Sequence, residues 1–198
     1  MGTDDPGIRR FRTALLPLIA LTLFAGAPLC AEEFPGGSLY RESFQFRNDR
    51  GEAADLTAFR GRNVILTMFY TDCTSTCTLT LSKLREIERA FEEKKIPVEL
   101  VLVSFDARND SPRNLARFRK REKLPAARWH LLTGDTASIR RLATRIGLGN
   151  FSDLGDHILH AFRIVLLDEQ GVIRKSLDWD HRKVESLFEE VTPAANSR

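Results

Sequence analysis

Two cysteines four residues apart, Cys73 and Cys77, are the residues of this chain best suited to chemistry. They follow the apolar run 64–70, which predicts a buried strand, then a turn, then the first turn of a helix. Side chains four apart share one helix face, and a helix N-terminus favours the thiolate form. Such a pair can cycle between dithiol and disulfide, or hold a soft metal ion.

A third metal ligand would have to come from one of four histidines. These are His130, His157, His160 and His181. Cu(I) favours thiolates, often with one imidazole. His160 lies directly before a predicted strand at 161–167, so it reaches the thiols if that strand begins beside them. His157, three residues earlier, is an alternative, whereas His130 is interpreted as a packed strand residue and His181 as the start of the last helix.

The N-terminal segment, residues 1–31, is expected to be a signal peptide or an N-terminal anchor. Arg9, Arg10 and Arg12 precede an uncharged, mostly apolar stretch at 13–29. That stretch is short for a spanning helix and is broken by Pro17, which favours a cleaved signal over an anchor. A lipid on Cys30 is disfavoured by the bulky residue before it. We therefore expect a periplasmic protein that contacts the membrane only through this segment.

Residues 32–198 are expected to form a single domain, since 167 residues suffice for one core. They carry 27 basic and 25 acidic side chains. This net charge of +2 gives no reason to expect a nucleic-acid partner. Only Cys73 and Cys77 remain after export. A disulfide between them would close a small loop and stabilise the fold weakly, so a purely structural bridge is the less favoured interpretation.

Strands and helices alternate along this domain. Strands are predicted at 43–46, 63–70, 98–105, 129–132, 161–167 and 172–174, and helices follow the cysteines to 94 and then occupy 111–123, 135–147 and 181–191. The pattern predicts an α/β fold with a central mixed sheet flanked by helices on both faces. A cysteine pair at the end of an early strand makes a thioredoxin-like fold the closest analogy.

Several of these motifs resemble the SCO/SenC family, exported proteins of cytochrome oxidase assembly. The resemblance covers roughly residues 55–179. Its landmarks are the segment 69–77 with both cysteines, Val103-Ser104-Phe105-Asp106 followed by Asp110-Ser111-Pro112, Leu131-Leu132-Thr133-Gly134, and His160 eleven residues before Gly171. In the family's register, His160 rather than His157 is the metal histidine.

The resemblance implies a thioredoxin-like domain that binds copper through Cys73, Cys77 and His160. It implies delivery of copper to the copper-site subunit of cytochrome c oxidase or another cuproprotein, or reduction of that subunit's cysteines. A thiol reductant protein would be a second partner. The chain departs from the family at Thr74 and Thr78, where proline is usual, and at Leu159, where aspartate usually precedes the histidine. These departures leave His157, which does follow an aspartate, open as a contributor.

Three functions compete for the cysteine pair. The first is a copper metallochaperone. The second is a thiol-disulfide oxidoreductase, in which Cys73 attacks a partner disulfide and Cys77 resolves the mixed disulfide. The third is a thiol peroxidase, whose sequence pattern is not evident. No proline lies between Pro125 and Pro193, so the cis-proline that faces the thiols in thioredoxin relatives is missing, which favours the first.

Other polar residues have simpler interpretations. The cations of helix 111–123 are interpreted as a solvated face, with docking to an acidic partner or an anionic membrane as the alternative. Asp72 is expected to cap the helix that follows the cysteines, with tuning of the thiols as the alternative. Asp106 is expected either to support the site or to hold a turn or cap a helix, and Met68 is expected to lie in the core.

Overall fold

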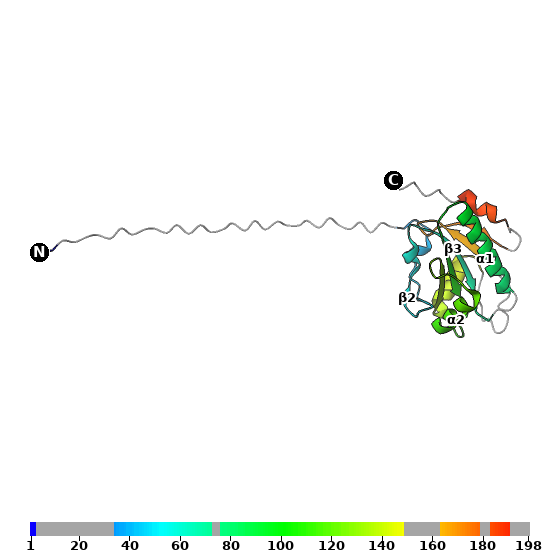
Figure 1. The fold of residues 1–198 in the computed structure, drawn as a ribbon, viewed down its shortest axis with the longest axis horizontal. Helices are drawn as coiled ribbons and strands as arrows, with labels where there is room; N and C mark the ends of the chain where they lie inside the picture. The colour runs from blue at the N-terminus through cyan, green and yellow to red at the C-terminus, as the bar shows by residue number, and fades with distance from the viewer. Residues whose placement is uncertain (3–33, 73–75, 149–162, 179–182, 191–198) are drawn as a thin grey trace. The chain divides into compact units, whose positions relative to one another are not determined.

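The computed structural model describes residues 1–2, 34–72, 76–148, 163–178 and 183–190 (Figure 1). The chain divides into two compact units, Met1–Glu32 and Glu33–Arg198, and every element named here belongs to the second. The 3-10 helices are η1 (Leu39–Arg41), η2 (Leu56–Phe59) and η3 (Val184–Glu190), and the α-helices are α1 (Thr76–Glu93), α2 (Pro112–Glu122) and α3 (Thr136–Arg145). Among these described helices, none combines the length and the apolar character needed to span a membrane.

Seven strands form one sheet. They are β1 (Phe46–Asn48), β2 (Ala53–Ala54), β3 (Asn63–Phe69), β4 (Val98–Ser104), β5 (Trp129–Gly134), β6 (Ile164–Leu167) and β7 (Ile173–Leu177), in the order β2-β1-β5-β4-β3-β6-β7. The strands β3, β4 and β5 run parallel, whereas β1 and β6 pair antiparallel to β5 and β3. The predicted mixed sheet is therefore confirmed. All seven residues of β3 are buried, as the continuous apolar run predicted.

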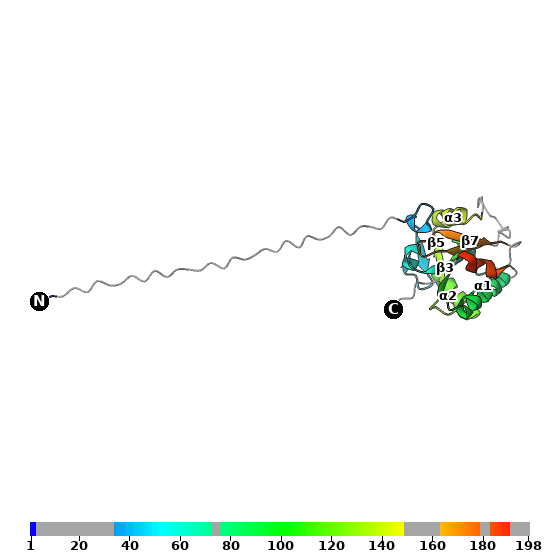
Figure 2. The ribbon, with the colours of Figure 1, turned by 90° about the horizontal axis from the view of Figure 1, so that it is seen from above.

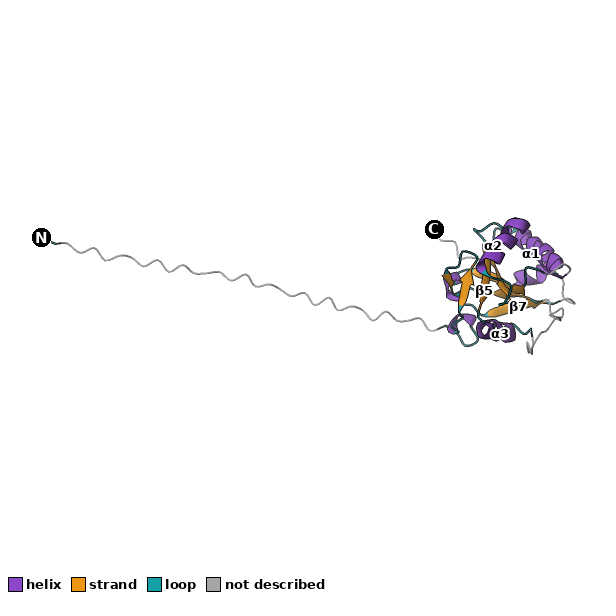
Figure 3. Ribbon diagram, turned by 90° about the horizontal axis from the view of Figure 1, so that it is seen from below, coloured by secondary structure: helices purple, strands orange, loops and turns teal. Residues whose placement is uncertain are grey.

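Helices cover both faces of this sheet. Figures 2 and 3 show α1 and α2 on one face and α3 on the other. Alternate residues of β3 supply the two cores: Ile65 and Phe69 join the core under α1 and α2, and Val64 and Leu66 join the core under α3. This division follows from the two-residue repeat of a strand, which points successive side chains to opposite faces.

The helix starts follow the capping residues that the sequence predicted. Ser111 accepts a hydrogen bond from the Asn114 amide at the start of α2, and Pro112 occupies the first helical position, where its missing N–H costs nothing. Asp135 accepts from the Ser138 amide at the start of α3. These caps fix where each helix leaves the sheet.

Two predicted elements differ in the structure. The first strand lies at β1 rather than at 43–46, because the Gln45 amide donates to Ser138 Oγ instead of joining a ladder. The last predicted helix, 181–191, is in the described residues the shorter 3-10 helix η3, where the Ser186 amide donates to the Lys183 carbonyl. Its buried side chains, Val184 and Leu187, are three apart and so share one face at three residues per turn.

The two ends of the sheet are bordered by different segments of the chain. We call the end where β3 and β4 finish and β6 begins the cysteine end, because α1 follows β3 there. The opposite end is the hairpin end, where β6 turns into β7. There the Gly171 amide donates to the Asp168 carbonyl, and Gly171 has φ +77°, as the predicted hairpin turn requires.

Candidate metal and redox site

The cysteine pair flanks the start of α1. This helix begins at Thr76, so the backbone of Cys77 lies in its first turn, where the sequence predicted it. Cys73 is in the segment 73–75, outside the described residues, and the side chain of Cys77 is also not described. Backbone N–H groups of a first helical turn have no intrahelical acceptor, so a thiolate there is favoured.

The predicted histidine ligand, His160, lies outside the described residues, as do His157 and His181. The strand that follows it is described. Ile164 of β6 pairs with Thr67 of β3, and Thr67 Oγ1 donates to the Arg163 carbonyl at 2.7 Å. The chain therefore enters β6 at the cysteine end, as the proposed ligand set requires. Arg163 follows His160 by three residue steps, which can span about 11 Å at most between the two Cα atoms.

His130 and Met68, which were predicted to be packed residues rather than metal ligands, are packed in the structure. His130 of β5 contacts Glu99, with 2.7 Å between Nε2 and Oε2, and its ring lies edge-on to that of Phe59 at 4.8 Å between centroids. Met68 of β3 is 7 % exposed and belongs to the core under α3. Both side chains are thereby occupied in packing.

The loop after β3 is held by a buried carboxylate for which the sequence indicated no role. Asp110, directly before α2, is 1 % exposed. Its Oδ2 accepts from the Thr71 amide at 3.0 Å, and its Oδ1 accepts from Thr71 Oγ1 at 2.5 Å. Ser104, the last residue of β4, also donates its hydroxyl to Oδ2 at 2.5 Å. We call the connection between β3 and α1, residues 70–75, the cysteine loop. Thr71 is two residues before Cys73, so this network reaches the start of that loop.

Burial raises the pKa of the Asp110 carboxyl above its ordinary value. The hydrogen bonds from Ser104 and Thr71 act in the opposite direction, because they favour the ionised form, and the nearby charge of Asp106 raises the pKa further. No cation pairs with Asp110 among the residues that the structure describes. The carboxylate depends on Ser104 and Thr71 for its stabilisation.

The other acidic residues near this end differ from Asp110. Asp106 holds a turn: its carboxylate accepts from the amides of Arg108 and Asn109 and from Asn109 Nδ2. This is the turn role considered from the sequence. Asp72 is exposed, and its predicted role as a cap of α1 stays a prediction.

The basic side chains of α2 differ in their exposure and in their contacts. Arg113, Arg117 and Lys120 are exposed, as expected of a solvated face. Arg119 instead forms an ion pair with Asp49, at 2.5 Å between Nε and Oδ2, with both side chains largely buried. Arg121 donates from Nη2 to the Thr71 carbonyl at 2.9 Å, so this exposed helix also contacts the cysteine loop.

Within the described ranges, no group of three His, Cys, Asp or Glu side chains could hold a metal ion. The three predicted ligands are not described as side chains. Their chemistry nevertheless suits Cu(I), because two thiolates and one imidazole are soft or borderline donors. A surface groove elsewhere, between α1 and the start of β5, is lined by charged side chains such as Glu88 and Arg85 beside Trp129. Because β5 runs parallel to β3 and β4, its start lies at the end of the sheet opposite the cysteine end.

Comparisons with known proteins agree with this architecture. The SCO1/SenC family model matches residues 33–196. A SCO1 protein homolog of Bacillus subtilis is 24 % identical over 137 residues, which covers 68 % of this chain and 71 % of that protein.

Solved structures show the same fold. BsSco, a member of the Sco family of cytochrome c oxidase assembly proteins in which a disulfide switch was identified, has a TM-score of 0.65 and 20 % identity, covering 79 % of this chain and 94 % of its own. Yeast Sco1 with copper bound has a TM-score of 0.62 and 18 % identity, covering 78 % and 95 %. The fold is therefore thioredoxin-like, and with a family model that spans most of its length, the chain belongs to the SCO1/SenC family.

Proposed function

We propose that this protein is an exported copper metallochaperone, periplasmic or anchored through residues 1–31, with residues 32–198 as its single copper-binding domain. Copper is its cargo. Cys73 and Cys77 would bind it as thiolates and His160 as a neutral imidazole. The acceptor would be the copper-site subunit of cytochrome c oxidase or another cuproprotein, and a thiol reductant protein would keep the cysteines reduced.

The observation that carries this proposal is the direction of β6. Because β6 runs antiparallel to β3 and begins opposite Thr67, the chain enters β6 at the end of the sheet where α1 begins. His160 is four residues before Ile164, the first residue of β6. Copper-bound relatives with this fold, from yeast and Arabidopsis thaliana, support copper as the cargo.

The thiolates would also control release. Copper would leave by ligand exchange with thiols of the acceptor, one donor at a time. A disulfide is a poor ligand for Cu(I), so oxidation of the pair would eject the metal. Binding therefore requires reduced thiols in an oxidising compartment, which is the role of the reductant partner.

The test is an anaerobic Cu(I) titration of the reduced full chain against a chromophoric chelator. One copper per chain is expected. Cys73→Ser and Cys77→Ser should each abolish tight binding, because one thiolate is lost from a three-ligand set, and His160→Ala should weaken it while disulfide formation persists. His130→Ala is the matched control, since His130 lies in β5 and contacts Glu99, and it should bind copper as the wild type does.

Two outcomes would change the assignment. Wild-type affinity in Cys73→Ser would remove the cysteine pair as the metal site. Unchanged affinity in His160→Ala, with loss in His157→Ala, would transfer the third ligand to His157.

A thiol-disulfide oxidoreductase is the second candidate. The disulfide switch in BsSco, which shares the fold, and the position of Cys77 in the first turn of α1 favour it. In that function Cys73 would attack a partner disulfide and Cys77 would release the reduced partner. Fully reduced protein that fails to compete for Cu(I), yet reduces a disulfide in the acceptor, would establish this function instead.

A further inference from the structure

All the backbone and side-chain polar groups of Thr71 are bound. Its amide and its hydroxyl both donate to Asp110, at 3.0 Å and 2.5 Å, and its carbonyl accepts from Arg121 Nη2 at 2.9 Å. Thr71 is 7 % exposed and Asp110 is 1 % exposed. We call these three residues the Thr71 clamp.

The clamp is anchored to the central strands of the sheet. Asp110 also accepts from Ser104, the last residue of β4. Directly beside it, the Phe105 amide donates to the Phe69 carbonyl at 3.0 Å, which continues the pairing of β3 with β4 by one step. The position of Thr71 is thus fixed relative to the strands rather than to the loop that follows it.

Helix α2 does not need Asp110 for its own start. Its capping position is occupied by Ser111, whose side chain accepts from the Asn114 amide. Burying a carboxylate without a cation is unfavourable, and it is tolerated only where hydrogen bonds compensate. Two of the three side-chain bonds that Asp110 accepts come from Thr71. The hydrogen bonds that compensate for the burial of Asp110 therefore also hold Thr71 in place.

Fixing Thr71 shortens the connection that carries Cys73. Strand β3 ends at Phe69 and α1 begins at Thr76, so six residues join them. With Thr71 clamped, only residues 72–75 remain between two fixed points. A shorter connection between fixed ends has fewer conformations, and Cys73 lies within it while Cys77 lies in α1.

We propose that Asp110 and Arg121 are positioning residues, which hold Thr71 so that Cys73 and Cys77 stay at a separation suited to sharing one copper ion or one disulfide bond. The inference rests on the proposed function for its copper readout, whereas its disulfide readout is independent of copper. Holding two groups in place before they bind raises affinity because less freedom is lost on binding.

Two quantities depend on the separation of the sulfurs. One is the Cu(I) affinity of the reduced protein. The other is the equilibrium in which the protein disulfide and two glutathione thiols give the protein dithiol and glutathione disulfide. A looser loop lowers the effective concentration of one thiol at the other, so both the copper complex and the disulfide should become less stable.

Thr71→Val is the first variant, because valine keeps the shape and the backbone bonds and removes only the hydroxyl. We expect copper affinity to fall about tenfold, the effect of one strong hydrogen bond to a charged group. The disulfide should become about tenfold easier to reduce, which is a shift of about 30 mV in reduction potential for a two-electron couple. Thr71→Ser keeps a hydroxyl and should restore both quantities.

Ser38→Ala is the matched control. Ser38 is 1 % exposed, donates to the Gln170 carbonyl at 2.5 Å and accepts from the Tyr40 amide. The Ser38→Ala variant therefore also loses a buried hydroxyl, but at the hairpin end. We expect it to lower the melting temperature while leaving the copper affinity and the reduction potential unchanged.

Two further variants test the hydrogen bond from Arg121 to the Thr71 carbonyl. Arg121→Met removes the donor to Thr71, and Arg117→Met removes an exposed arginine of the same helix whose side chain contacts Asn114. We expect about a threefold loss in both quantities for Arg121→Met, because this donor is solvent-exposed, and no change for Arg117→Met.

The proposal is overturned if Thr71→Val lowers only the melting temperature, with copper affinity and reduction potential within twofold of the wild type. An equal shift in Ser38→Ala would overturn it too, because the effect would then follow from general destabilisation. If the wild type takes up no Cu(I), the proposed function fails, and the glutathione equilibrium of the same variants still decides whether the clamp positions the thiols.

Discussion

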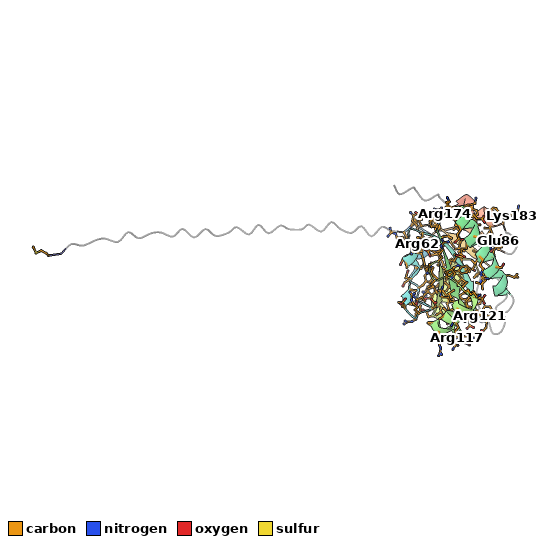
Figure 4. All side chains as sticks on the ribbon, in the orientation of Figure 1. Arg62, Glu86, Arg117, Arg121, Arg174 and Lys183 are labelled. Atoms are coloured by element: carbon orange, nitrogen blue, oxygen red, sulfur yellow. The ribbon has the colours of Figure 1, made fainter. Side chains whose placement is uncertain are left out.

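The two ends of β3 use buried polar groups in different ways. At the hairpin end, backbone pairs join separate connections: the Gly61 amide donates to the Glu169 carbonyl at 2.8 Å, and the Leu39 amide donates to the Gly171 carbonyl at 2.9 Å. The Asp168 carboxylate there accepts from amides of its own turn, those of Gln170 and Val172. At the cysteine end, a buried carboxylate binds a loop residue from a different connection of the fold. In Figure 4, Arg62 and Arg174 mark the hairpin end, and Arg117 and Arg121 lie toward the other end of the domain.

This difference predicts which substitutions change only the stability of the fold and which also change the properties of the thiols. Backbone pairing at the hairpin end can be satisfied by many sequences, and it fixes only the connections that it joins. The network around Asp110 instead requires particular side chains on β4, on α2 and after β3. We therefore expect substitutions at the hairpin end to change the free energy of unfolding alone, and substitutions at the cysteine end to change both unfolding and the properties of the thiols.

The largest effect is expected for Gly171→Ala at the hairpin end. Gly171 has φ +77°, and an added Cβ would lie 2.6 Å from Cγ of the Tyr40 ring. Left-handed strain and overpacking together should lower the free energy of unfolding by about 3 kcal/mol, measured by urea denaturation, while the copper affinity of the folded protein stays unchanged.

Gly51→Ala is the control for this substitution. Gly51 has φ +83°, but nothing lies within 4 Å of its Cβ position, so it should lose only about 1 kcal/mol from backbone strain. Equal losses in the two variants would show that the Tyr40 ring yields. A changed copper affinity in Gly171→Ala would break the separation between the two ends.

A smaller loss of stability is expected for Asp110→Asn at the cysteine end. An amide offers one acceptor atom where the carboxylate offers two, so one of the buried donors loses its partner. The free energy of unfolding should fall by about 2 kcal/mol at pH 7. Copper affinity should fall as well, which no variant at the hairpin end should show.

The pH dependence of this variant tests the ionisation of Asp110. Burial raises its pKa in the folded protein, so the folded state holds the proton more tightly than the unfolded state does. The stabilisation from protonation is complete below the unfolded pKa and is lost as the pH rises through the folded value. The stability of the wild type relative to Asp110→Asn should therefore increase as the pH falls from 7 to 4. A constant difference would contradict the raised pKa.

The smallest effect is expected for Tyr40→Phe at the hairpin end. The Tyr40 hydroxyl is buried and has no hydrogen-bond partner among the described residues, and burial raises its pKa well above the ordinary value. Removing an unsatisfied buried hydroxyl should stabilise the protein by about 1 kcal/mol, seen as a higher melting temperature. A lower melting temperature would mean that the hydroxyl makes a bond in solution.

Local patterns were enough to predict most elements. The apolar run at 64–70 predicted the buried strand β3, and Ser111 with Pro112 predicted the start of α2. These signals are short-range, since burial on both faces and helix capping leave a trace within a few residues. The 3-10 geometry of η3 was not predicted, because its buried residues at a spacing of three suit either helix type.

The support of the cysteine loop could not be predicted in this way. Thr71 and Asp110 are 39 residues apart, and each is an ordinary loop residue within its own stretch of sequence. Only the parallel pairing of β3 with β4 brings the two connections to the same end of the sheet. An acidic residue in the loop after the neighbouring parallel strand was the available signal, and Asp106 met that description as well as Asp110.

Sequence alone was enough to predict the chemistry that we propose for this protein. Two thiols at a spacing of four after a buried strand, with a histidine before a later strand, already indicate soft-metal or redox chemistry, because donor type and strand order are written in the residues. The tertiary structure decided which acidic side chain is buried and which cation contacts the loop. Burial and hydrogen bonding depend on segments far apart in the chain, so only the folded sheet distinguishes Asp110 from Asp106 and Arg121 from its neighbours on α2.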